Sequence, residues 1–176
     1  MKLLSKIAAL AIAIVSALAV PAVASPLQCV PYARSRSQIE LYGNAATWWS
    51  QAQGLYARGQ TPRTGSVLVF KASGAMPVGH VAVVRKIVDD RHVMLDHANW
   101  SRPGMIETSA LAEDVSATGD WSSVRVWYAP TRSLGVRVSP AFGFIYAPGV
   151  EAPETRSISL ASKQFDAAFA DFSMRD

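Results

Sequence analysis

The chain contains a single cysteine, Cys29, which has no second cysteine with which to form a disulfide within the chain. Residues 1–24 combine Lys2 and Lys6 with an apolar run and a small-residue ending at Ala24, which is typical of a secretory signal peptide. We expect cleavage after Ala24 and delivery to the periplasm or secretion from the cell. An unpaired thiol in an oxidising compartment calls for a chemical explanation.

Removal of the signal peptide leaves 152 of the 176 residues, which suits one domain with its own core. We predict that domain over residues 25–148 and a C-terminal tail over residues 149–176, either disordered or loosely helical from Leu160 to Phe172. A retained membrane anchor at residues 1–24 is the alternative, but the apolar run is short against the roughly 20 residues that span a bilayer. We therefore expect membrane contact only through the removed signal peptide.

The charge balance argues against a nucleic-acid partner. Loss of Lys2 and Lys6 lowers the formal net charge from +4 to +2. The sequence contains no arginine-rich stripe and no phosphate-binding loop, so the remaining charge at most favours mildly anionic surfaces such as cell-wall polymers.

Helical patterns precede strand patterns along the chain. Residues 29–40 and 44–53 predict two helices, with Pro31 in the first turn of one and Asn44 as the cap of the other. β-Branched runs then predict strands over residues 66–70, 80–88, 92–99, 122–128 and 141–146, with a hairpin turn at residues 89–91. Residues 105–115 are expected to be irregular with a short helix. This order predicts an α+β fold.

Cys29 and His80 are the first candidates for a catalytic pair. Cys29 opens the first predicted helix, and His80 opens an apolar strand. A helix N-terminus and a facing imidazole both favour a thiolate, so we expect the pKa of Cys29 to lie below that of an ordinary thiol. The alternative is a buried structural cysteine.

A catalytic imidazole also needs a polar group on its far nitrogen to hold its orientation. His97 and Asn99 share one face of a predicted strand and are both candidates, whereas His92 should project to the opposite face and be solvated. Asp96 points away in a regular strand and is a reserve candidate if a bulge precedes Asn99. One cysteine and three histidines lack the spacing of a zinc cluster, so we expect no metal and no cofactor.

Five short blocks occur in order and at suitable intervals: residues 29–33, residues 43–45 followed by Trp48, residues 62–70, residues 79–84, and Asn99-Trp100. With these blocks, residues 27–130 resemble the CHAP family, the cysteine, histidine-dependent amidohydrolase/peptidase domains of bacterial cell-wall enzymes. The resemblance implies a papain-like α+β fold with N-terminal helices packed on an antiparallel β-sheet. It also implies Cys29 as the nucleophile and His80 as the general base and acid.

The third polar residue departs from the pattern of the family. Many relatives have an acidic residue where this chain has His97, but some related papain-like cell-wall peptidases use histidine there. His97 can therefore orient His80, with Asn99 supporting or replacing it. Gln28 either helps to bind the oxyanion or is solvated.

The resemblance further implies an exported peptidoglycan hydrolase that cleaves an amide bond through a cysteine thioester. The bond is either that of an N-acetylmuramoyl-L-alanine amidase or that of a peptide-bridge endopeptidase. We expect a monomer whose partner is the glycan strand or stem peptide of peptidoglycan, with specificity from the loops at residues 71–78 and 101–121. Trp48, Trp49 and Tyr56 either line the groove or, as we prefer, pack in the core.

Two other readings keep the fold but change the role of the protein. A non-catalytic envelope-binding protein would retain the domain without turnover. A secreted effector aimed at other cells would have the same chemistry and differ only in its delivery.

Overall fold

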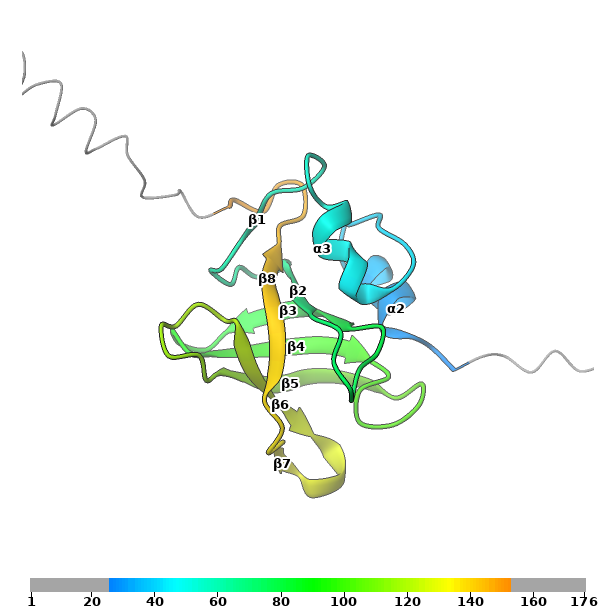
Figure 1. Cartoon of the computed structure of the whole chain (residues 1–176), viewed down its shortest axis with the longest axis vertical. Helices are drawn as coiled ribbons and strands as arrows, with labels where there is room; N and C mark the ends of the chain where they lie inside the picture. The colour runs from blue at the N-terminus through cyan, green and yellow to red at the C-terminus, as the bar shows by residue number, and fades with distance from the viewer. Residues whose placement is uncertain (1–25, 153–176) are drawn as a thin grey trace, which may run out of the picture.

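The computed structural model of the protein describes residues 26–152 (Figure 1). The predicted signal peptide and the predicted tail helix lie outside the described residues. Three short helical segments come first, and strands follow. The helical segments are α2 (Cys29–Arg36), η1 (Ala45–Thr47) and α3 (Trp48–Gln51). The strands and a late 3-10 turn are β1 (Arg58–Gly59), β2 (Val67–Phe70), β3 (His80–Ile87), β4 (His92–Ala98), β5 (Ile106–Asp114), β6 (Ser123–Tyr128), η2 (Ala129–Thr131), β7 (Ser133–Leu134) and β8 (Ser139–Ile145).

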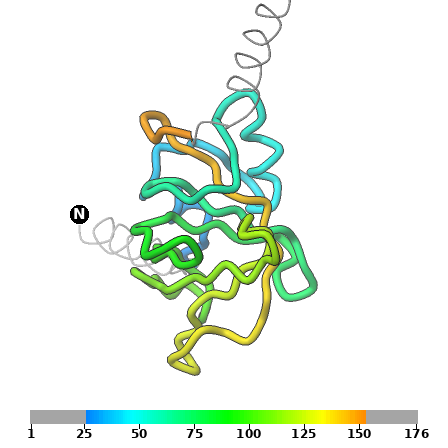
Figure 2. Tube along the Cα trace, turned by 90° about the vertical axis from the view of Figure 1, so that its left-hand side faces the viewer, coloured from blue at the N-terminus to red at the C-terminus, as the bar shows by residue number. Residues whose placement is uncertain are grey.

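The strands form one antiparallel sheet that closes into a six-stranded barrel. Its strands pair in the order β8, β2, β3, β4, β5 and β6, and a further pairing of β6 with β8 completes the ring. Closure leaves the central strands without free edges. The short β1 pairs antiparallel with the end of β8, and the β6–β7 hairpin projects from the barrel at the end away from α3 (Figures 1 and 2). The predicted α+β class, with N-terminal helices on an antiparallel sheet, is confirmed.

Strand β2 and the first five residues of β3 are buried on both faces, which explains their nearly continuous apolar sequences. Alternate residues of the two strands, including Val67 and Val81, pack against the helices. The intervening residues, including Leu68 and Ala82, point into the barrel. Because α2 and η1 cover β3 from outside, the start of β3 lies between the helical layer and the barrel interior.

The prediction for residues 105–115 is wrong, because β5 occupies Ile106–Asp114. This stretch contains alanine and glutamate, which favour helices in isolation, but pairing with β4 and β6 overrides that local preference. Buried and exposed residues do not alternate regularly along β5, because the backbone of Ser109 is left-handed, with φ of 59°. Local sequence therefore did not reveal the strand.

The helical predictions were too long. The first helix ends at Arg36, and the second is a 3-10 turn followed by one turn of α-helix. The side chain of Asn44 makes no capping hydrogen bond; its carbonyl accepts hydrogen bonds from the Thr47 backbone and hydroxyl instead. Across residues 26–152, we find no helix with the length and hydrophobicity needed to span a bilayer.

Candidate active site

Cys29 and His80 line the same pocket, which has a volume of about 390 Å³. One side of the pocket comes from the segment before β3, and the other comes from the end of β4, β6 and the segment that follows β7. The lining residues are Gln28, Cys29, Ala75, Met76, Pro77, Val78, Gly79, His80, Asn99, Trp100, Val126, Tyr128, Gly135, Val136 and Arg137. The two residues that the sequence paired are thus brought to one opening, although they are 51 positions apart.

Cys29 is the first residue of α2, and its side chain is close to the start of β3. Gln28 before it has an extended backbone, and its carbonyl accepts the first hydrogen bond of the helix from Tyr32. Burial raises the pKa of the Cys29 thiol, while the backbone N–H groups of Val81, Val30 and Cys29 act in the opposite direction. This corrects our expectation of a lowered pKa: Cys29 is only 8% exposed, and the loss of water outweighs the helix N-terminus.

His80 is held in place by the turn that precedes it. Gly79 has a φ of +72°, and a Cβ there would lie 2.7 Å from the backbone nitrogen of Ala46 and from the carbonyl oxygen of Phe70. Only glycine fits a left-handed turn this close to two backbone segments. The turn delivers the His80 imidazole to the mouth of the barrel, where its register partner in β2 is Phe70.

The imidazoles of His80 and His97 contact each other. His80 Nε2 lies 3.1 Å from His97 Nδ1, and both residues are almost fully buried. Trp100 packs beside both rings, at centroid distances of 4.9 Å from His80 and 5.7 Å from His97. Its Nε1 donates a hydrogen bond to the carbonyl of Trp127, which fixes the indole.

Burial also sets the protonation of the two histidines. Desolvation lowers the pKa of His80 well below its ordinary value, and the charge of His97 adds to this effect. Desolvation lowers the pKa of His97 to about 4, with Asp96 acting in the opposite direction. A raised thiol pKa and lowered imidazole pKa values both favour the neutral forms of these groups near neutral pH.

Asn99 is directed to a different partner. Its Nδ2 donates to Gln28 Oε1 at 2.8 Å, and its Oδ1 accepts from the Gly104 backbone at 2.9 Å. Gln28 Nε2 donates in turn to the Pro26 carbonyl at 3.0 Å. Asn99 therefore orients the side chain next to Cys29, whereas His97 is the residue beside His80.

Asp96, the reserve candidate, lies outside the histidine pair. Its carboxylate accepts hydrogen bonds from Arg85 at 3.1 Å and from the Ser109 backbone at 2.9 Å. A register shift between Leu95 and His97 in the pairing of β4 with β5 accompanies this arrangement. The charge of Asp96 reaches His97 only through space.

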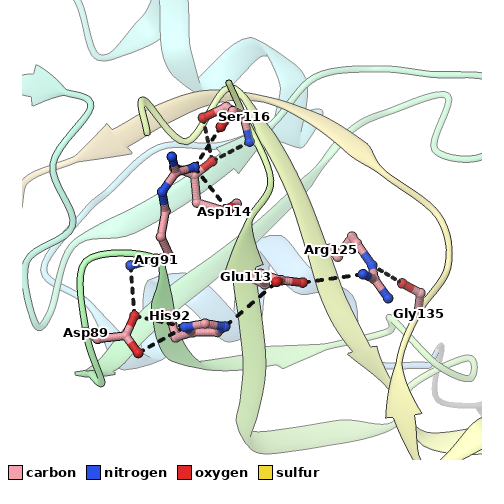
Figure 3. Close-up of polar contacts among 8 residues, drawn as sticks. All are labelled: Asp89, Arg91, His92, Glu113, Asp114, Ser116, Arg125 and Gly135. Carbon is pink, nitrogen blue, oxygen red and sulfur yellow. Dashed lines mark hydrogen bonds and ion pairs between the residues drawn. The ribbon is translucent and has the colours of Figure 1, made fainter. Parts of the chain in front are cut away.

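His92 belongs to a polar network on another part of the barrel (Figure 3). Its Nδ1 lies 2.8 Å from Asp89 Oδ1, and its Nε2 lies 3.9 Å from Glu113 Oε1. Glu113 also forms an ion pair with Arg125, whose Nη1 lies 3.5 Å from Glu113 Oε2. Since His92 does not line the pocket, it serves as a control residue for the site.

The predicted groove is partly corrected by the structure. The segment at residues 71–78 contributes Ala75 to Val78, but the range 101–121 contributes no lining residue because much of it is β5. Residues 135–137, which we had not singled out, form that side of the pocket. Trp48 is fully buried, and Trp49 stacks on Phe142, so these tryptophans pack in the core as preferred.

No group of three or more histidine, cysteine, aspartate or glutamate side chains within residues 26–152 has the arrangement of a metal site. The pocket is lined by the thiol of Cys29 and by the imidazole of His80, which contacts a second imidazole, that of His97. A thiol activated by an imidazole that a third group orients is the arrangement used in nucleophilic acyl transfer.

Residues 21–99 match the family model of the CHAP domain. The resemblance that the sequence blocks indicated is thereby confirmed. The matched segment contains Cys29, His80, His97 and Asn99. CHAP domains form a family of cysteine- and histidine-dependent hydrolases, which implies a cell-wall amidase or peptidase. No curated protein matches the sequence.

Proposed function

We propose that the protein is an exported peptidoglycan hydrolase that cleaves an amide bond through a thioester on Cys29. The observation that carries the proposal is the pocket shared by Cys29 and His80, with His97 Nδ1 placed 3.1 Å from His80 Nε2. Either the amide between muramic acid and L-alanine or an amide of a peptide bridge would undergo the same chemistry. Cleavage of the signal peptide after Ala24 would place the enzyme in the periplasm or outside the cell.

The reaction begins from a neutral pair. As Cys29 Sγ attacks the carbonyl carbon of the substrate, His80 takes the thiol proton, so no stable thiolate is needed in the resting enzyme. His80 then protonates the leaving amine as the carbon–nitrogen bond breaks. Water, deprotonated by His80, attacks the thioester; the carboxylic acid product leaves, and the proton returns to the thiol.

The oxyanion has candidate donors at the start of α2. The backbone N–H of Cys29 lies in the first turn, where helical N–H groups lack internal acceptors. Gln28 adds a side-chain amide that lines the pocket and is held by Asn99. Asn99 therefore contributes by orienting Gln28, while His97 orients His80.

The shape and charge of the pocket suit a peptide segment. Met76, Pro77 and Val78 give one side an apolar surface, and Val136 faces them from the segment after β7. Arg137 supplies the charged side chain among the lining residues of this pocket. An apolar groove with a cation at its edge fits a peptide that carries a free carboxylate, as stem peptides do.

Digestion of purified muropeptides, with mass analysis of the products, tests the proposal. Wild-type protein should release products that identify the bond, and Cys29→Ala and His80→Ala should abolish their release. His92→Ala is the matched control, because it removes a histidine outside the pocket and should retain the wild-type rate. Equal cleavage by the Cys29→Ala variant would refute the thioester mechanism. Binding of muropeptides by wild type without any product would favour the non-catalytic envelope-binding protein.

A further inference from the structure

We infer that Glu107 is a positioning residue that fixes the tautomer of His97 and thereby places the basic lone pair of His80 on Nδ1. The inference rests on the proposed function. Sequence patterns gave no signal for Glu107, because it lies in a stretch that we expected to be irregular and follows no recognisable motif.

The sheet register brings Glu107 to the histidine pair. His97 of β4 and Glu107 of β5 are direct cross-strand partners. Glu107 Oε2 lies 3.7 Å from His97 Nε2, and the two side chains are 6% and 0% exposed. A carboxylate is thus buried on the side of His97 opposite to His80. Burial of a carboxylate is costly unless charges or hydrogen-bond donors compensate for it.

His97 Nε2 has no hydrogen-bond partner within the described part of the chain. The distance to Glu107 is too long for a hydrogen bond but short for an electrostatic contact inside a protein. If Nε2 carried a lone pair, that lone pair would face a carboxylate and be repelled. A proton on Nε2 is attracted instead, so the carboxylate selects the tautomer of His97 with Nε2 protonated.

The tautomer of His97 determines the tautomer of His80 through the hydrogen bond between them. When His97 Nε2 carries the proton, Nδ1 is an acceptor, and His80 Nε2 must donate across the 3.1 Å contact. The lone pair of His80 is then on Nδ1, the nitrogen that is not committed to His97 and that would accept the thiol proton in the proposed reaction. When His80 becomes positively charged during attack, the carboxylate of Glu107 stabilises that charge through His97.

Glu107 is itself held rigidly. Its Oε2 accepts from the Ser101 backbone at 3.1 Å, and its Oε1 accepts from the Ser101 hydroxyl at 2.8 Å. The same hydroxyl accepts from the Ala129 backbone at 3.0 Å. These contacts also allow a purely structural role, in which Glu107 anchors the turn after β4. The experiment must therefore separate catalysis from stability.

The other charged or titratable groups near the histidine pair come from three elements. Cys29 lies at the start of α2, Asp96 follows Leu95 in β4, and Arg85 of β3 pairs with Asp96 at 3.1 Å. The ion pair with Arg85 offsets the charge of Asp96. Glu107 is the carboxylate that His97 faces directly.

The test compares Glu107→Gln with Glu113→Gln, the same substitution on the same strand but in the surface network of Figure 3. Hydrolysis of soluble muropeptides should show kcat reduced roughly 10- to 100-fold in Glu107→Gln with KM unchanged, since Glu107 does not line the pocket. Glu113→Gln should match wild type, and Glu107→Asp should recover part of kcat. A lowered melting temperature with unchanged kcat would overturn the inference and leave Glu107 a structural residue.

A second measurement does not depend on activity. Nitrogen-15 NMR of the imidazoles reports which ring nitrogen carries the proton, and we expect protons on Nε2 of both His80 and His97 in the wild-type protein at neutral pH. A proton on His97 Nδ1 would overturn the inference even if the enzyme cleaves peptidoglycan. Conversely, the expected tautomers without any cleavage would support the positioning by Glu107 and count against the proposed function.

Discussion

The buried imidazole of His97 should make the stability of the protein depend on pH. In the folded protein its pKa is about 4, whereas an exposed histidine in the unfolded chain has the ordinary value of 6.5. Between these values the unfolded state binds more protons than the folded state, so the free energy of unfolding falls as the pH falls from about 6.5 to about 4. At about 1.36 kcal/mol per pKa unit, the full loss is about 3 kcal/mol, and about 2 kcal/mol of it is reached by pH 5.

The variant His97→Gln isolates this contribution. Glutamine does not titrate, and it retains a polar group that can accept a hydrogen bond from His80. Urea unfolding of both proteins at pH 7 and at pH 5 gives four free energies of unfolding. Wild type should lose about 2 kcal/mol more than the variant over this interval. Groups that titrate alike in both proteins cancel in the comparison.

Equal losses in the two proteins would refute the reasoning. They would mean that His97 binds its proton equally well in the folded and unfolded states, as an imidazole in contact with water would. The burial of the histidine pair, and the neutral resting site that follows from it, would then be wrong.

Three further predictions address the site. Gly79→Ala should lower the free energy of unfolding by about 2 kcal/mol or more and reduce activity. Gly43→Ala is the control, since Gly43 has a similar φ of +76° but nothing within 4 Å of the added Cβ, and it should lower the free energy of unfolding by only about 1 kcal/mol. Equal losses of stability in urea unfolding would show that the close packing at Gly79 does not matter. Iodoacetamide should alkylate Cys29 at a higher pH in the folded protein than in the urea-unfolded chain, because burial raises the pKa of the thiol. Alkylation of the folded protein at a lower pH than the unfolded chain would instead indicate a preformed thiolate. In muropeptide digestion, Asn99→Ala should slow cleavage roughly tenfold, and His97→Ala should slow it more strongly. If His97→Ala instead keeps the full rate while Asn99→Ala loses activity, then Asn99 is the residue that orients His80.

The strands that the sequence predicted are those with dense β-branched residues. β2 and the first half of β3 are apolar on both faces, and β4 begins after a recognisable hairpin turn at residues 89–91. β5 could not be predicted because its alanines and glutamates carry no strand preference, and only pairing with β4 and β6 imposes the extended backbone. Closure of the barrel was equally hidden, since it requires β8 to pair with β2, where Val67 and Ile145 are 78 positions apart, as well as with β6.

Cys29 and His80, the proposed nucleophile and base, could be singled out because each lies at the beginning of an element with a clear local pattern. The alternation of β4 also placed His97 and Asn99 on a candidate face. It could not separate them, because the left-handed backbone of Asn99, with φ of 63°, ends the regular alternation and turns its side chain to Gln28. That choice depends on contacts between segments about 70 residues apart.

The sequence by itself determined the chemical groups, the order of helices before strands, and the resemblance to the CHAP family. The tertiary structure decided how burial shifts the pKa values of those groups and which of the groups meet. The pKa of Cys29 is raised because packing removes water from the thiol, and Glu107 reaches His97 because the register of two neighbouring strands makes them partners. Desolvation and cross-strand pairing arise only when distant segments pack together, so neither can be inferred from local sequence.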